Sequence, residues 1–124
     1  HVSSGRRNLR PWEDHFDFLD RLPEFLARQP RPCVIAGDFN QRIPPVRISP
    51  IARELNERLL RSLDGFPIAT HGIEAGLLDH IAVSSGLASD RISNWAGSIG
   101  QLRLTDHWGA CASIIERHPG MLRE

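Results

Sequence analysis

The stretch CVIAGDFN, residues 33–40, constrains the fold more than any other part of the sequence. Residues 33–36 form a continuous apolar run with a proline before it and a glycine after it, which is typical of a strand buried on both faces. Residues 37–40 would then lie at the carboxyl end of that strand. Strand ends and the loops after them commonly carry the chemistry of a protein. We therefore expect Asp38 and Asn40 at a functional edge of a sheet.

Two helices flank this strand in the hydrophobic pattern. Apolar residues recur at three- and four-residue steps over residues 11–29, which predicts an amphipathic helix that Pro23 should kink or split. Residues 41–50 contain three prolines and read as a loop. A second helix is predicted over residues 50–63, with Ser49 as its N-cap and Pro50 in its first turn. Apolar runs bounded by turn residues predict further strands over 68–71, 77–84, 92–95 and 109–115.

Length and composition favour one mixed α/β domain spanning residues 1–124. The fifteen basic residues are all arginine, and fifteen acidic residues balance them to a formal net charge of zero. Proteins that coat nucleic acid usually carry a basic surplus, because neutralisation of phosphates supplies most of their affinity. The charge balance therefore argues against a DNA-coating role, but not against a catalytic one.

The remaining sequence features are the two cysteines, the absence of a membrane-spanning or leader pattern, and the first residues. Cys33 and Cys111 lie in apolar runs and are expected to be core residues, with a disulfide as the less favoured alternative. No apolar run is long enough for a membrane span and no leader pattern is present, so a soluble chain is expected and the cytoplasm is favoured. Residues 1 and 2, followed by the turn-like Ser3-Ser4-Gly5, look like the last step of a strand whose earlier part is missing.

Three short clusters carry the residues suited to chemistry: Gly37-Asp38-Phe39-Asn40, Leu78-Asp79-His80-Ile81 and Thr105-Asp106-His107. Taken singly, each has a structural alternative: a common Gly-Asp turn, a polar pair at a strand edge, and a cap at the start of the last strand. Together they offer oxygen ligands for a divalent cation, a base for water and donors for a phosphate oxygen. Their joint occurrence, each beside a strand, favours phosphoryl chemistry.

These clusters resemble, in order and spacing, the motifs of the endonuclease/exonuclease/phosphatase superfamily, which has the DNase I-like fold. The first resembles its GDFN motif, the second its (I/L)DHI motif and the third its terminal SDH, with threonine for serine. The resemblance covers the whole chain but only the C-terminal half of the family domain. It implies half of a four-layer α/β sandwich, namely one mixed sheet with outer helices. The inner apolar face would need the missing half, a second copy or another cover.

The resemblance also implies a role for each matched residue. Asp38 would orient or deprotonate the attacking water, and Asn40 would hold that water and a phosphate oxygen. Asp79 would accept a hydrogen bond from His107, which would contact the scissile phosphate. Asp106 would help to bind the metal, Mg²⁺ or alternatively Mn²⁺. His1 would contact phosphate or act as an acid/base partner. His80 should point to the opposite face of its strand from Asp79 and be structural.

One departure from the family pattern bears on activity. The family's principal metal ligand is a glutamate in its N-terminal half, and no residue of this chain replaces it. The expected function is therefore a metal-dependent phosphoester hydrolase present as a fragment that has little activity alone. The alternative is a folded, inactive half-domain that associates with another subunit or with itself. The substrate, a nucleic acid or a small phosphorylated molecule, stays open.

Overall fold

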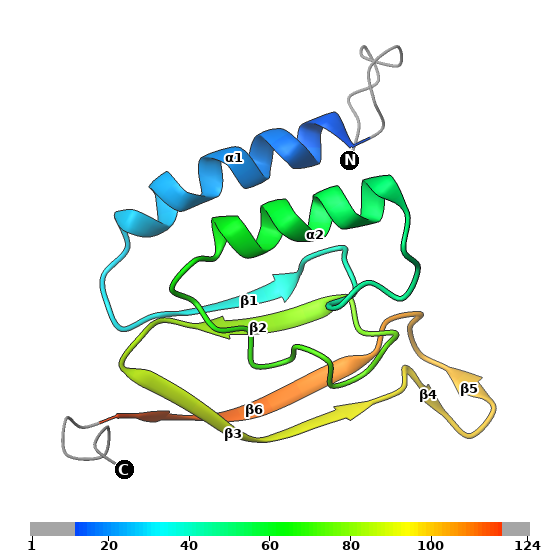
Figure 1. Ribbon diagram of the computed structural model, residues 1–124. Coiled ribbons are helices and arrows are strands. Elements are labelled where there is room, and N and C mark those ends of the chain that lie inside the picture. Colours follow the sequence, from blue (N-terminus) through cyan, green and yellow to red (C-terminus); the bar gives the residue numbers. More distant parts are fainter. Residues whose placement is uncertain (1–11, 118–124) are drawn as a thin grey trace.

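The computed structural model describes residues 12–117, which form two helices and six strands in a mixed α/β arrangement. Both helices lie side by side on one face of the strands (Figure 1). The elements follow one another as α1 (Glu13–Ala27), β1 (Val34–Asp38), α2 (Pro50–Ser62), β2 (Asp79–Val83), β3 (Leu87–Trp95), β4 (Ser98–Ile99), β5 (Leu102–Arg103) and β6 (Gly109–Glu116).

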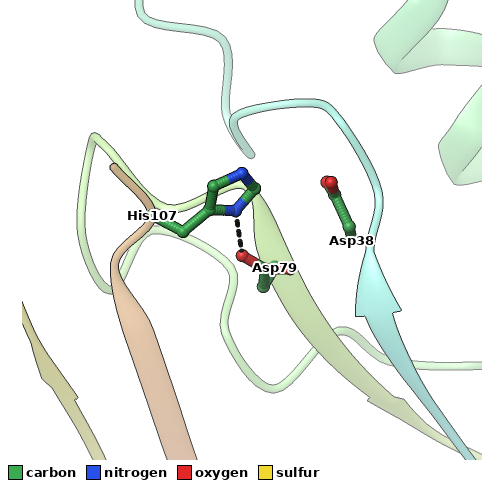
Figure 2. Close-up of side chains that lie close together, drawn as sticks. All are labelled: Asp38, Asp79 and His107. Carbon is green, nitrogen blue, oxygen red and sulfur yellow. Dashed lines mark hydrogen bonds and ion pairs between the residues drawn. The ribbon is translucent and has the colours of Figure 1, made fainter. Parts of the chain in front are cut away.

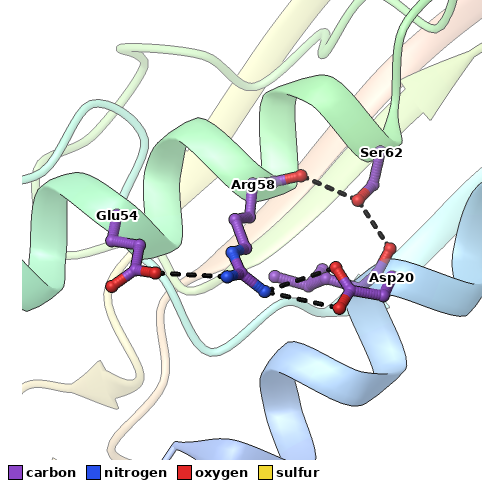
Figure 3. A network of polar contacts seen from close by, with 5 residues as sticks. Asp20, Glu54, Arg58 and Ser62 are labelled. Atoms are coloured by element: carbon purple, nitrogen blue, oxygen red, sulfur yellow. Dashed lines mark hydrogen bonds and ion pairs between the residues drawn. The ribbon is translucent and has the colours of Figure 1, made fainter.

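Helix α1 runs through Pro23 as one element, so of the expected kink or split at this residue the split does not occur. A proline inside a helix has no N–H for the carbonyl four residues earlier, here that of Leu19. The hydroxyl of Ser62 on α2 lies 2.7 Å from this carbonyl oxygen and donates a hydrogen bond to it (Figure 3). The neighbouring helix thus replaces the donor that proline removes.

Helix α2 begins as predicted and is fastened to α1 by an arginine. The Ser49 hydroxyl accepts a hydrogen bond from the backbone N–H of Ala52 at 3.2 Å, which confirms the N-cap. Arg58 reaches across to Asp20 on α1 at 3.3 Å, and Figure 3 shows its guanidinium between carboxylates of both helices. The same guanidinium lies 4.4 Å from the centroid of the Phe16 ring, within cation–π range.

The strands form three two-stranded antiparallel sheets: β1 with β2, β3 with β6, and β4 with β5. Strand β2 also contacts β3 and β6, so the first two sheets lie against each other (Figure 1). Residues 12–117 contain no parallel pair, and the expected mixed sheet is therefore not formed by them. The reason is that Asp38, which ends β1, pairs with Asp79, which begins β2. The segment that contains α2 leaves the sheet at the end of β1 and returns to that same end, so β2 runs antiparallel to β1.

Two smaller expectations about strands are wrong. Residues 68–71 make only an isolated bridge, between Ile68 and Ala82, rather than a strand. Strand β1 is not buried on both faces, because Val34 and Ala36 are exposed. Within the described residues, helices cover only one face of this strand.

A compact core between the helices and β2 contrasts with an uncovered apolar surface elsewhere. The core cluster comprises Leu19, Leu26, Ile43, Leu59, Leu63, Phe66 and Ala82, all buried. On β1, β3 and β6, the apolar side chains of Val34, Trp95 and Ile115 are about half exposed. Cys111 is a free, exposed thiol and Cys33 is a free, half-buried one, so the expectation that both are core residues is wrong for Cys111. No helix within residues 12–117 is long and apolar enough to span a bilayer.

Candidate active site

Three of the predicted site residues converge at one end of the sheet. Asp38 ends β1 and is paired in register with Asp79 at the start of β2. His107 lies two residues before β6. One ligand atom from each of the three lies within 4.8 Å of those of the other two, and Figure 2 shows their side chains gathered above the strand ends. Side chains from three distant stretches of sequence thus form one group, which we call the Asp38–Asp79–His107 trio.

A short hydrogen bond joins two members of this trio. Nδ1 of His107 lies 2.6 Å from Oδ2 of Asp79, as drawn in Figure 2, and this confirms the predicted contact between them. The side chains of both residues are about a third exposed. The pKa of His107 is raised, first by the hydrogen bond to Asp79 and then by that carboxylate's charge, with smaller contributions from Asp38 and Asp106. The arrangement favours a protonated imidazole whose Nδ1–H donates to Asp79.

Asp38 and Asn40 are joined by a tight turn after β1. The backbone N–H of Asn40 donates to Oδ1 of Asp38 at 2.8 Å, and Asn40 has a φ of 55°. Asparagine is among the side chains that tolerate this left-handed region. The N–H of Phe39 donates to the carbonyl of Leu78, the residue before Asp79, at 2.9 Å. The turn is therefore tied to β2, and both Asp38 and Asn40 stay exposed to solvent.

A buried histidine supports this turn from below. His80 is 1% exposed, as strand alternation predicted for a structural residue. Its Nε2 lies 2.8 Å from the carbonyl of Gln41, and its Nδ1 lies 2.8 Å from the Thr70 hydroxyl, which accepts an N–H from Ile81 at 3.2 Å. Burial lowers the pKa of His80. A neutral imidazole that donates from Nε2 and accepts at Nδ1 satisfies every group in this chain of hydrogen bonds.

The donor set of the trio fits a divalent cation. The two carboxylates supply the oxygen ligands that Mg²⁺ or Mn²⁺ prefers, and Mg²⁺ usually keeps several waters besides one or two carboxylates. Asp106, the expected metal ligand, is exposed and lies outside this convergent set. The backbone N–H of His107 donates to the Thr105 hydroxyl at 3.2 Å, and this turn brings His107 rather than Asp106 into the set. His1 lies outside the described residues.

A cavity beside the trio was not anticipated from the sequence. Its volume is about 630 Å³, and Trp12, Arg42 and Arg47 are among its lining residues. The sequence marked residues 41–50 only as a loop, since proline content predicts irregular structure but not a hollow. Two arginines in one short loop were the only available signal.

No family model, curated protein or solved structure matches the chain.

Proposed function

We propose that this chain is a metal-dependent phosphoester hydrolase module with its chemistry at the Asp38–Asp79–His107 trio. The observation that carries the proposal is the convergence of these side chains within 4.8 Å, with His107 hydrogen-bonded to Asp79. Metal-assisted phosphoester hydrolysis requires carboxylates for a cation, a base for water and a donor for phosphate oxygen. The resemblance to the endonuclease/exonuclease/phosphatase superfamily, and with it the half of a DNase I-like sandwich, belongs to this proposal.

The two aspartates have separate tasks in this proposal. Oδ1 of Asp38 is engaged by the Asn40 N–H, so Oδ2 is the atom proposed to accept a proton from the attacking water. The Asn40 side chain would hold that water and a phosphate oxygen. Asp79 orients His107 by accepting from Nδ1, so Nε2 is left to donate to the phosphate.

The cation would be held by Oδ1 of Asp79, the carboxylate oxygen that the hydrogen bond to His107 leaves unengaged, while the charge of Asp38 lies nearby and its Oδ2 is kept for the attacking water. Nδ1 of His107 is already committed to Asp79. The role that the resemblance gives to Asp106 is retained as a competing proposal for the ligand. A bound Mg²⁺ or Mn²⁺ supplies charge stabilisation to the phosphoryl oxygens.

Metal binding and hydrolysis test this proposal together. Mn²⁺ binding is measured by titration calorimetry on chain freed of metal with EDTA, and hydrolysis is measured with bis(p-nitrophenyl) phosphate. We expect Asp38→Asn and Asp79→Asn to weaken Mn²⁺ binding and to lower metal-dependent hydrolysis by about 100-fold or to background. Asp64→Asn, at an exposed aspartate after α2, is the matched control and should change neither. Loss of binding only in Asp106→Asn would assign the ion to that residue instead.

Metal-dependent hydrolysis that persists unchanged in Asp79→Asn, or that is absent even when the family's N-terminal half is added, would refute the hydrolase proposal. Because no residue of this chain replaces the family's glutamate, turnover by the chain alone is expected to be low. Adding the family's N-terminal half, fused or in trans, is expected to raise it.

A second proposed function is that of an inactive half-domain that associates through its apolar surface. The half-exposed side chains of Val34, Trp95 and Ile115 favour it. Sedimentation equilibrium of the chain separates the two proposals. Concentration-dependent association without any metal-dependent hydrolysis would support the half-domain, whereas hydrolysis lost in Asp79→Asn would support the enzyme.

A further inference from the structure

The cavity of about 630 Å³ lies at the turn that follows Asp38 of the trio. Its walls come from Trp12 before α1, the loop after β1 and the first turns of α2. Asn40 and Leu78 also line it. The N–H of Asn40 is bound to Asp38, and Leu78 directly precedes Asp79, so these two residues belong both to the cavity wall and to the edge that carries the trio. Asn40, proposed above to hold a phosphate oxygen, is therefore shared by the proposed hydrolytic site and the cavity wall.

The charge in the cavity is one-sided although the whole chain is neutral. Arg42 and Arg47 line it, and within residues 12–117 no aspartate or glutamate does. Among residues 12–117 neither arginine has an ion-pair or side-chain hydrogen-bond partner, whereas Arg58 is paired with two carboxylates. Two unpaired guanidinium groups on one loop are suited to a phosphate, which they can bind through paired N–H donors.

The rest of the lining is apolar and contains an aromatic ring. Trp12 supplies an indole, and Leu55 and Leu78 supply aliphatic surface. Flat rings of ligands gain affinity by packing on such aromatic side chains. The volume falls within the range of about 300–1,000 Å³ that small-molecule sites occupy. The cavity thus offers room for a ring as well as for an anion.

We propose that this cavity is a second phosphate-binding pocket, which takes a phosphate joined to a flat ring while the scissile phosphate lies at the trio. This inference rests on the proposed hydrolase function for the placement of the scissile phosphate. Arg42 and Arg47 bind the second phosphate, and Trp12 packs against the ring. The substrate class is then a phosphoester that carries at least one further phosphate and a ring of nucleobase size.

The test is a binding measurement that does not depend on turnover. Titration calorimetry of the chain in EDTA compares adenosine 5′-diphosphate, pyrophosphate and adenosine. We expect adenosine 5′-diphosphate to bind at least tenfold more tightly than adenosine. The double variant with Arg42→Gln and Arg47→Gln should bind adenosine 5′-diphosphate at least tenfold more weakly than the unchanged chain does. Arg103→Gln, at an exposed arginine of β5 outside the cavity, is the matched control and should leave binding unchanged.

Trp12→Leu tests the ring separately. It should weaken binding of the nucleoside diphosphate more than binding of pyrophosphate, and circular dichroism melting establishes that each variant is folded. Equal affinities for adenosine and its diphosphate, or full binding by the double arginine variant, would overturn the pocket. If the chain binds as expected but hydrolyses nothing, the hydrolase function fails and the pocket stands. If hydrolysis depends on Asp79 but the diphosphate does not bind, the pocket fails and the hydrolase function stands.

Discussion

The contact between Ser62 and the Leu19 carbonyl predicts an energetic coupling between two helices. Pro23 removes the N–H that this carbonyl would otherwise accept, and Leu19 is 1% exposed, so no water can replace it. The Ser62 hydroxyl, 2.7 Å away, is the donor that satisfies it. Ser62→Ala would leave a buried carbonyl without a partner.

The expected loss of stability follows from the penalty for an unsatisfied buried acceptor, about 1–3 kcal/mol. We therefore expect Ser62→Ala to lower the free energy of unfolding by about 2 kcal/mol. For a chain of this size this corresponds to a fall in Tm of roughly 6–8 °C. Urea unfolding followed by circular dichroism measures the difference directly.

A double-mutant cycle with Pro23→Ala identifies the cause. In that background residue 23 has an N–H for the Leu19 carbonyl, so the loss of the Ser62 hydroxyl should cost about 1 kcal/mol less. The Ser62 hydroxyl also lies 2.7 Å from the carbonyl of Arg58 and has a single proton, so in the Pro23→Ala background that proton can go to Arg58 instead of Leu19. Equal costs of Ser62→Ala with and without Pro23 would refute the reasoning, because the hydroxyl would then not be substituting for the proline.

Three further predictions concern the histidines. Asp79→Asn should lower the pKa of His107, because it removes the hydrogen bond and the charge that raise it, and NMR titration in EDTA measures the shift. Because the pKa of His107 is higher in the folded state, its protonation stabilises the fold below the unfolded pKa of about 6.5, and this stabilisation is lost as pH rises through the folded pKa. Asp79→Asn should therefore destabilise the chain more at pH 6 than at pH 8.5, as measured by urea unfolding. The pKa of His80 is lowered in the folded state, so its effect on stability has the opposite pH dependence: the fold loses stability as pH falls below the unfolded value of about 6.5. His80→Leu should remove that acid-side loss while costing about 2–4 kcal/mol at pH 8, since the Gln41 carbonyl and the Thr70 hydroxyl lose their partner.

The sequence was informative where a local pattern determines the structure. Strand alternation separated half-buried Asp79 from fully buried His80, and the Ser49-Pro50 pair predicted where α2 begins. The trio could be anticipated because each member lies beside a strand, and the Asp79–His107 hydrogen bond is confirmed.

Other features depend on contacts between distant residues and could not be predicted in this way. The continuity of α1 depends on a serine 39 positions after Pro23. The β4–β5 hairpin has two-residue strands, too short to show alternation. Whether Asp106 or His107 joins the trio is decided by the turn at Thr105, because adjacent residues in a loop carry no fixed periodicity.

The support beneath the Asn40 turn has a consequence for how this protein can diversify. His80 holds the loop through the main-chain oxygen of Gln41, a group that every amino acid possesses. Replacement of side chains further along the loop, at Arg42 or Arg47, leaves that attachment intact. Side chains of this loop can therefore change through successive substitutions while the Asp38–Asp79–His107 trio keeps its position.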